Sequence, residues 1–114
     1  MNLITEELRA QLLANGRRSR EDENFDPMPV VKLFTADAGA TWLLTEIDPD
    51  DHDHAFGLCD LGQGFPELGY LSLAELQAVR GRLGLPVERD LHFKATMAIS
   101  AYAREARLAG RIMA

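Results

Sequence analysis

The tract at residues 48–54 holds the side chains of this sequence best suited to binding a cation. It reads Asp-Pro-Asp-Asp-His-Asp-His, with four carboxylates and two imidazoles in seven positions. Carboxylates bind hard divalent cations and imidazoles bind transition metals, so a divalent metal ion is one possible cofactor. The spacing fits no calcium loop, because the glycine required at the sixth position is absent. The metal interpretation uses four residues, Asp51, His52, Asp53 and His54.

The same tract is also typical of an exposed turn between two strands, where Asp and Pro are common for backbone reasons. A dense carboxylate cluster on a turn is weakly preorganised for a metal ion. We therefore predict no metal and no cofactor, and we expect the carboxylates to form a surface for a protein partner. The predicted partner-binding residues are Asp48, Asp50, Asp51, Asp53 and Glu67.

A second arrangement for chemistry involves Glu46 and Asp60, each in a predicted strand. Adjacent strands could bring the two carboxylates together, as a magnesium-dependent nuclease needs, although two solvent-facing acids are the favoured alternative. Cys59, the only cysteine, could act as a nucleophile with His92 as its base, but a lone cysteine in an apolar run is usually a core residue. We predict no catalytic residues, and the nuclease alternative would use Glu46, Asp60 and His92.

Charge is divided unevenly along the chain. The 114 residues carry a net charge of −6, yet residues 33–79 contain nine acidic side chains and no Lys or Arg. Residues 80–114 reverse the sign, with seven basic side chains against three acids. The acidic middle would repel phosphates and attract a basic partner protein, whereas the basic C-terminal third could contact nucleic acid.

Length and composition are those of one globular domain. A hydrophobic content of 46% is too high for intrinsic disorder, and no apolar run approaches the roughly 20 residues that span a bilayer. Glu6 and Glu7 stand where a signal peptide would be basic, so we expect no membrane association and a cytoplasmic location. The apolar side of the first helix would also suit a homodimer.

The elements that must position these residues begin with a helix. Thr5 is typical of an N-cap and Asn15-Gly16 of a helix stop, which predicts a short helix within residues 1–16. Residues 17–28 are polar and mixed in charge, and they are predicted to form a linker. The remaining residues, 29–114, are predicted to form a single α+β domain.

Runs of β-branched and apolar residues predict the strands of that domain. They lie at residues 30–35, 41–47, 55–61 and 68–73. Ser72 is expected to cap one helix and Ser100 the last helix. The predicted fold is α+β, with a three- to four-stranded antiparallel β-meander packed with about three helices.

Several strings of this sequence resemble a small bacterial domain of unknown function. They are TWLLTE, DPDD, AFGLCDLG and PELGY, within a similarity that runs from Val30 to the last helix. The family is common on plasmids, integrative elements and phages, and some members are labelled single-stranded DNA endonucleases. The resemblance implies a mobile-element setting and assigns no catalytic residue. Its motif positions here are Trp42, Glu46, Asp60, Glu67, Tyr70, Arg89 and His92.

Charge and resemblance together predict a non-enzymatic accessory protein of a mobile genetic element, which binds a protein partner through an acidic surface. An anti-defence role, against restriction or CRISPR systems, is one use of such a surface, because acidic proteins can imitate a phosphate backbone. The alternative function is a metal-dependent nuclease acting on single-stranded nucleic acid.

Overall fold

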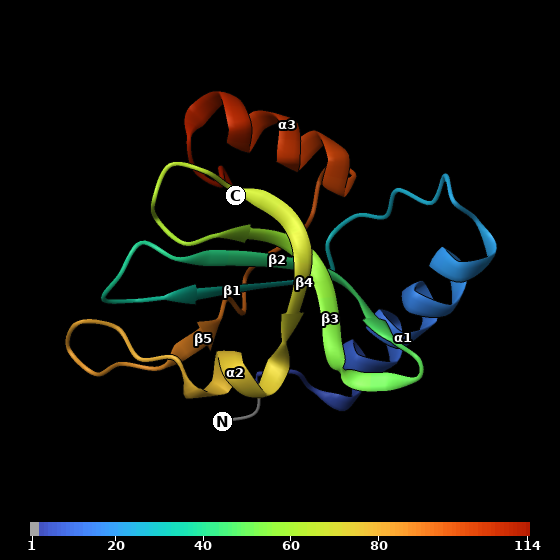
Figure 1. Cartoon of the computed structure of the whole chain (residues 1–114), viewed down its shortest axis with the longest axis horizontal. Helices are drawn as coiled ribbons and strands as arrows, with labels where there is room; N and C mark the ends of the chain where they lie inside the picture. The colour runs from blue at the N-terminus through green and yellow to red at the C-terminus, as the bar shows by residue number, and fades with distance from the viewer. Residues whose placement is uncertain (1–2) are drawn as a thin grey trace.

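A five-stranded antiparallel sheet forms the centre of the computed structural model, which describes residues 3–114 (Figure 1). The strands lie in the order β4-β3-β2-β1-β5, and three helices pack around them. The strands are β1 (Val31–Thr35), β2 (Thr41–Asp48), β3 (Asp51–Asp60), β4 (Glu67–Ser72) and β5 (Val87–Arg89). The helices are α1 (Glu6–Glu21), α2 (Leu73–Ala78) and α3 (Ile99–Ala109).

The α+β class is confirmed, and β1 to β4 form the predicted meander, since each strand pairs with the next. The predicted number of strands was too low. β5 pairs with the free edge of β1, with Leu33 opposite Arg89 and Thr35 opposite Val87. A strand of three residues is too short to produce an alternating pattern, so only its tertiary partner defines it.

Helix α1 begins where Thr5 predicts and continues past the predicted stop. The Leu8 amide donates to the Thr5 hydroxyl at 3.1 Å, as in an N-cap, but the helix runs to Glu21. The predicted linker at 17–28 therefore begins inside the helix. Asn15 and Gly16 do not end α1, because both contact β2.

The contact with β2 explains why Asn15 and Gly16 lie inside α1. β1 pairs with β2 no further than Leu44, which leaves the next carbonyls of β2 without a strand neighbour on that side. The Asn15 side-chain amide donates to the Thr45 carbonyl at 2.9 Å. A Cβ atom at Gly16 would lie 2.0 Å from the carbonyl oxygen of Ile47, so only glycine lets the helix approach this closely.

The segment after α1 forms hydrogen bonds with the start of α3. The Ser100 amide donates to the Asp26 carboxylate at 3.1 Å, and the Ser100 hydroxyl donates to the same carboxylate. The Ile99 amide donates to the carbonyl of Pro27 at 2.8 Å. The prediction that Ser100 caps α3 was therefore wrong, because the helix begins at Ile99. Asp26, from a distant part of the chain, provides the carboxylate that accepts from the first turn of the helix.

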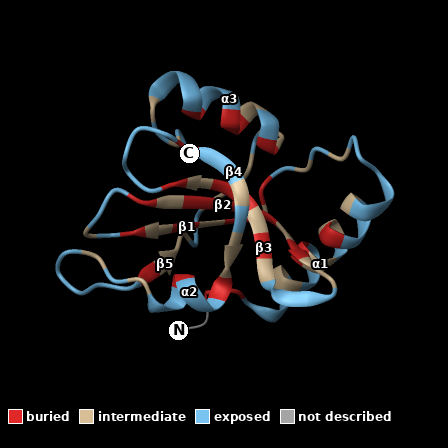
Figure 2. Ribbon diagram, in the orientation of Figure 1, coloured by how far each residue is buried: buried red, intermediate tan, exposed pale blue. Residues whose placement is uncertain are grey.

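Buried residues lie on the strands and on the helices (Figure 2). They form two apolar clusters, one on each face of the sheet. Leu44 faces the larger cluster with α1 and α2, whereas Leu43 and Leu58 face α3. Helix α3 lies over only part of its face, which leaves Tyr70 67% exposed. Within residues 3–114, no helix is long and apolar enough to cross a membrane.

A candidate binding site on the open half of the sheet

Three strands place one side chain each in a row on the sheet face that α3 covers in part. Glu46 on β2 is opposite Phe56 on β3, and Phe56 is opposite Tyr70 on β4. His54 lies two residues before Phe56 and therefore on the same face. We call these four residues, Glu46, His54, Phe56 and Tyr70, the open face.

A β-bulge in β2 turns Glu46 to this face. Strict alternation from Trp42 and Leu44 would place Glu46 with them in the larger core. The register of β2 against β3 shifts between Leu44 and Glu46, and Ile47 takes the core position instead. A bulge inserts an extra residue and redirects the following side chains, which is how the carboxylate reaches the open face.

The aromatic side chains of the open face form an ordered cluster. The rings of His54 and Tyr70 are stacked, with centroids 4.4 Å apart and planes inclined by 13°. The rings of Phe56 and Tyr70 meet edge to face, with centroids 5.0 Å apart. Both arrangements are favoured by the charge distribution of aromatic rings, so Tyr70 is held in place although most of it is exposed.

A concavity of about 270 Å³ lies between α1 and the open face. Helix α1 contributes Ser19 and Arg20 to its wall, and the β2–β3 turn contributes Asp48. The four residues of the open face also line it, as do Gly16 and Pro49. We call this concavity the Glu46 pocket.

Glu46 is a partly buried carboxylate in this pocket. Burial raises the pKa of Glu46, a hydrogen bond from the Ser19 side chain lowers it, and the charge of Asp48 raises it again. Across the described part of the chain, no Lys or Arg lies within ion-pair distance of Glu46. The pocket therefore presents a partly desolvated carboxylate to whatever enters it.

We expect Glu46→Gln to raise the free energy of unfolding at pH 7, by no more than about 0.5 kcal/mol because the site is half-exposed. Folding raises the pKa of Glu46, so the ionised carboxylate destabilises the folded state at neutral pH. The gain should disappear as the pH falls below the ordinary glutamate pKa of about 4.3. Urea unfolding of the wild type and of Glu46→Gln measures the difference in their free energies of unfolding at pH 7 and at pH 4. A variant that is less stable than the wild type at pH 7 would contradict this account.

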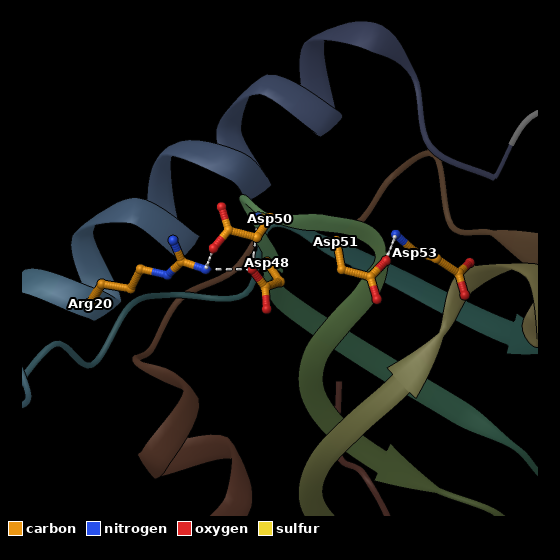
Figure 3. A network of polar contacts seen from close by, with 5 residues as sticks. All are labelled: Arg20, Asp48, Asp50, Asp51 and Asp53. Atoms are coloured by element: carbon orange, nitrogen blue, oxygen red, sulfur yellow. Dashed lines mark hydrogen bonds and ion pairs between the residues drawn. The ribbon is translucent and has the colours of Figure 1, made fainter.

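The β2–β3 turn uses two of its carboxylates within the chain (Figure 3). Nη2 of Arg20 lies 2.6 Å from Oδ1 of Asp48 and 2.9 Å from Oδ2 of Asp50. The Asp50 amide also donates to Asp48 at 2.8 Å, and this hydrogen bond, with the nearby Arg20 charge, lowers the pKa of Asp48. Arg20 thus holds the turn against α1, while the Asp50 side chain stays 80% exposed.

The other two aspartates of the tract lie on β3 and point away from Arg20 (Figure 3). Asp51 accepts a hydrogen bond from the Asp53 amide at 3.1 Å. Asp53 accepts from the Ser72 hydroxyl at 2.5 Å and from the Ala74 amide at 2.8 Å, and these hydrogen bonds lower its pKa. Ser72 caps α2 as predicted, and Asp53 supports the cap.

The structure does not bring Glu46 and Asp60 together. Asp60 is opposite Thr41, at the other end of the β2–β3 pair from Glu46, so the alternative in which the two carboxylates form a pair does not hold. The favoured expectation, two solvent-facing acids, is wrong for Asp60, which is buried. Asp60 is 2% exposed and accepts hydrogen bonds from the amides of Gly62 at 2.8 Å and Ile112 at 2.9 Å. Asp60 therefore connects the loop after β3 with the segment after α3.

The remaining predicted residues are spread over the fold. His92 follows β5 and lines a different concavity beside α3, whereas Cys59 packs against the larger core on the other sheet face. Burial raises the pKa of Cys59 to about 11, so the thiol is protonated at neutral pH. Glu67 is exposed on β4, opposite Cys59. Over residues 3–114, no three His, Cys, Asp or Glu side chains are grouped to hold a metal ion, and the four residues of the metal interpretation form no such group.

Sequence reasoning missed Phe56, Ser19 and Arg20, and it named Tyr70 only as a motif position. A signal for the aromatic cluster was present, because His54 and Phe56 are two residues apart, as are Leu68 and Tyr70, which puts each pair on one face of a strand. The contribution of α1 had no local signal, since it depends on how the helix crosses β2.

These features define a small α+β domain with an aromatic and acidic concavity on one sheet face. The chain belongs to the family described as protein of unknown function (DUF2958), which matches it over residues 3–113. This match supports the resemblance to a small domain of unknown function. No curated protein and no solved structure matches the chain.

Proposed function

We propose that the protein is a non-enzymatic binding module that docks a basic protein partner on the open face and on its acidic border, which consists of Asp48, Asp50 and Asp51. The observation that carries the proposal is Tyr70, a large aromatic side chain that is ordered by His54 and Phe56 and still 67% exposed. Ordered aromatic side chains at the centre of a contact surface commonly supply most of the binding energy in protein interfaces.

Charge around the open face supports a basic partner. Of the carboxylates we predicted for partner binding, Asp50, Asp51, Asp53 and Glu67 are exposed. Glu67 is opposite Cys59 and therefore belongs to the other sheet face, so the aspartates of the β2–β3 turn and the start of β3 provide the negative charge near the open face. Asp48 and Asp50 both pair with Arg20, so two negative charges face one positive charge at the turn. A surface of this kind attracts positively charged partners over a distance and speeds their association. Asp53 is excluded from our tests of docking, since it supports the cap of α2.

The setting we propose is a mobile genetic element, with anti-defence (anti-restriction or anti-CRISPR) as the role. The resemblance to domains common on plasmids and phages supports the setting. The acidic surface supports the role, because proteins that handle nucleic acid carry basic grooves that such a surface can enter. The cytoplasm, where these systems act, is the location that this proposal requires.

Site-specific photo-crosslinking in the host cell tests the proposal. We expect a photoreactive residue at position 70 and another at position 50 to capture the same protein, whereas one at Leu83, 81% exposed in the loop after α2, should not capture it. The captured protein, once purified, should bind the wild-type chain directly. Capture of unrelated proteins at positions 70 and 50, or equal capture at position 83, would contradict a specific docking surface.

Incubation with end-labelled single-stranded DNA tests the non-enzymatic part. We expect the DNA to remain intact with magnesium, with manganese and with EDTA, because Glu46 and Asp60 lie at opposite ends of the β2–β3 pair. Metal-dependent cleavage by the wild-type protein would contradict the proposal and favour the nuclease alternative.

A further inference from the structure

We propose that the Glu46 pocket binds an arginine side chain of the partner, with the guanidinium group against the Glu46 carboxylate and its flat face toward Tyr70. This inference rests on the proposed function, which it deepens by naming the chemical group that the open face recognises. Three features of the pocket support it: an unpaired carboxylate, an aromatic wall and an excess of negative charge.

The carboxylate lies where an entering cation could reach it. Glu46 lines a concavity of about 270 Å³ together with Ser19 of α1, and the Ser19 side chain lowers the pKa of the carboxyl group that burial raises. A carboxylate can accept a pair of parallel hydrogen bonds from the two N–H groups of a guanidinium, a geometry that an ammonium group does not offer. A partly desolvated carboxylate also gains more from such a pair than an exposed one does.

The aromatic wall favours a flat cation. Tyr70 stacks on His54 and meets the edge of Phe56, so its ring is fixed in the wall of the same pocket, with Phe56 on the strand between it and Glu46. Arginine stacks on aromatic faces and gains from the negative charge of the ring face. The chain already shows this type of contact at Arg18, whose guanidinium carbon lies 4.6 Å from the centre of the Phe25 ring.

The net negative charge of the pocket favours the binding of a second guanidinium group. Arg20 occupies the turn side of the pocket and pairs with Asp48 and Asp50, not with Glu46. One positive charge therefore faces three carboxylates, from Glu46, Asp48 and Asp50. An added cation would neutralise part of this excess, and it would leave the Arg20 ion pairs intact.

A guanine base is another group that presents two N–H donors to a carboxylate and stacks on an aromatic ring. The surroundings of the pocket disfavour it, because a nucleotide brings phosphate groups close to Asp48, Asp50 and Asp51. Phosphates would be repelled there. The arginine side chain is therefore the occupant that the charges favour, and guanosine monophosphate becomes the competing probe in the test.

Titration of the ¹⁵N-labelled full chain with N-acetyl-arginine amide, followed by NMR, tests the inference. We expect saturable shifts centred on the amides of Ser19, Glu46 and Tyr70. The citrulline analogue has nearly the same shape without the charge, and it should bind at least about tenfold more weakly, as should guanosine monophosphate. The lysine analogue should also bind more weakly, because it lacks the flat, two-pronged donor.

Two variants and a control locate the site. Glu46→Gln should weaken arginine binding by about tenfold, and Tyr70→Leu by about fivefold, because the second variant keeps an apolar side chain and removes the ring. Glu6→Gln removes an exposed carboxylate from the first turn of α1, outside the pocket, and should leave the affinity within about twofold.

The inference is overturned by no saturation up to about 50 mM, by equal binding of citrulline, or by tighter binding of guanosine monophosphate. Unchanged affinity in both Glu46→Gln and Tyr70→Leu would also overturn it. The outcome is separate from that of the proposed function: crosslinking can identify a partner whose arginines avoid this pocket, and the pocket can bind arginine although no partner is captured.

Discussion

Gly16→Ala is expected to lower the free energy of unfolding by about 2–3 kcal/mol, although alanine favours helices over glycine by about 1 kcal/mol. The reason is the contact between α1 and β2. The added Cβ would lie 2.0 Å from the carbonyl oxygen and 3.1 Å from the carbonyl carbon of Ile47, and both atoms belong to a strand at the centre of the sheet. The helix would have to move away and lose the hydrogen bond from Asn15 to Thr45.

Urea unfolding of the wild type and of Gly16→Ala measures this difference. Gly69→Ala is the matched control, because a Cβ at Gly69 meets nothing within 4 Å. The control should change stability by no more than about 0.5 kcal/mol. If Gly16→Ala were as stable as the control, the close approach of α1 to β2 would be wrong. The wall that Ser19 and Arg20 give to the Glu46 pocket would then be in doubt as well.

Asp60→Ala is expected to lower the free energy of unfolding by about 2–4 kcal/mol. The Asp60 carboxylate accepts hydrogen bonds from the amides of Gly62 and Ile112, and the residue is 2% exposed. Removing it deprives two amide donors of their acceptor in part-buried hydrogen bonds and leaves a cavity at a buried position. Hydrogen exchange at the Gly62 and Ile112 amides should accelerate, and urea unfolding should show the loss.

Glu67→Ala, which removes an exposed carboxylate from the neighbouring part of the sheet, is the control and should stay within about 0.5 kcal/mol of the wild type. Equal stabilities for Asp60→Ala and the wild type would contradict the structural role. Loss of any activity in Asp60→Ala would not by itself identify a catalytic residue, because the variant is expected to be destabilised. Glu46→Gln is the cleaner variant, since that side chain is only partly buried.

Local patterns were sufficient to predict most of the fold. Thr5 and Ser72 cap helices because their side chains reach amides three residues away, a distance that sequence reasoning covers. Residues 41–47 were predicted to form a strand because they are rich in residues that favour sheets, and they lie in β2. Asn15-Gly16 misled the prediction because their partner is the backbone of β2, some 30 residues away. The role of Asp26 at the start of α3 has the same explanation, with a separation of 74 residues.

The candidate site could be predicted only in part. The acidic tract was found from composition, but its geometry assigns Asp48 to Arg20 and Asp53 to the cap of α2. Glu46 and Asp60 were both noticed as carboxylates in strands. Their separation depends on the register of β2 against β3, which alternation does not fix. The bulge that turns Glu46 to the open face is likewise a property of the paired strands.

The affinity of the purified partner as a function of salt tests the central claim, that a basic protein docks on the acidic border of the open face. We expect the double variant Asp50→Asn/Asp51→Asn to bind about three- to tenfold more weakly than the wild type at low salt, and to depend less on salt. Glu6→Gln/Glu7→Gln, which removes two exposed charges at the other end of α1, should match the wild type. Equal affinity and equal salt dependence for wild type and Asp50→Asn/Asp51→Asn would contradict docking on this surface.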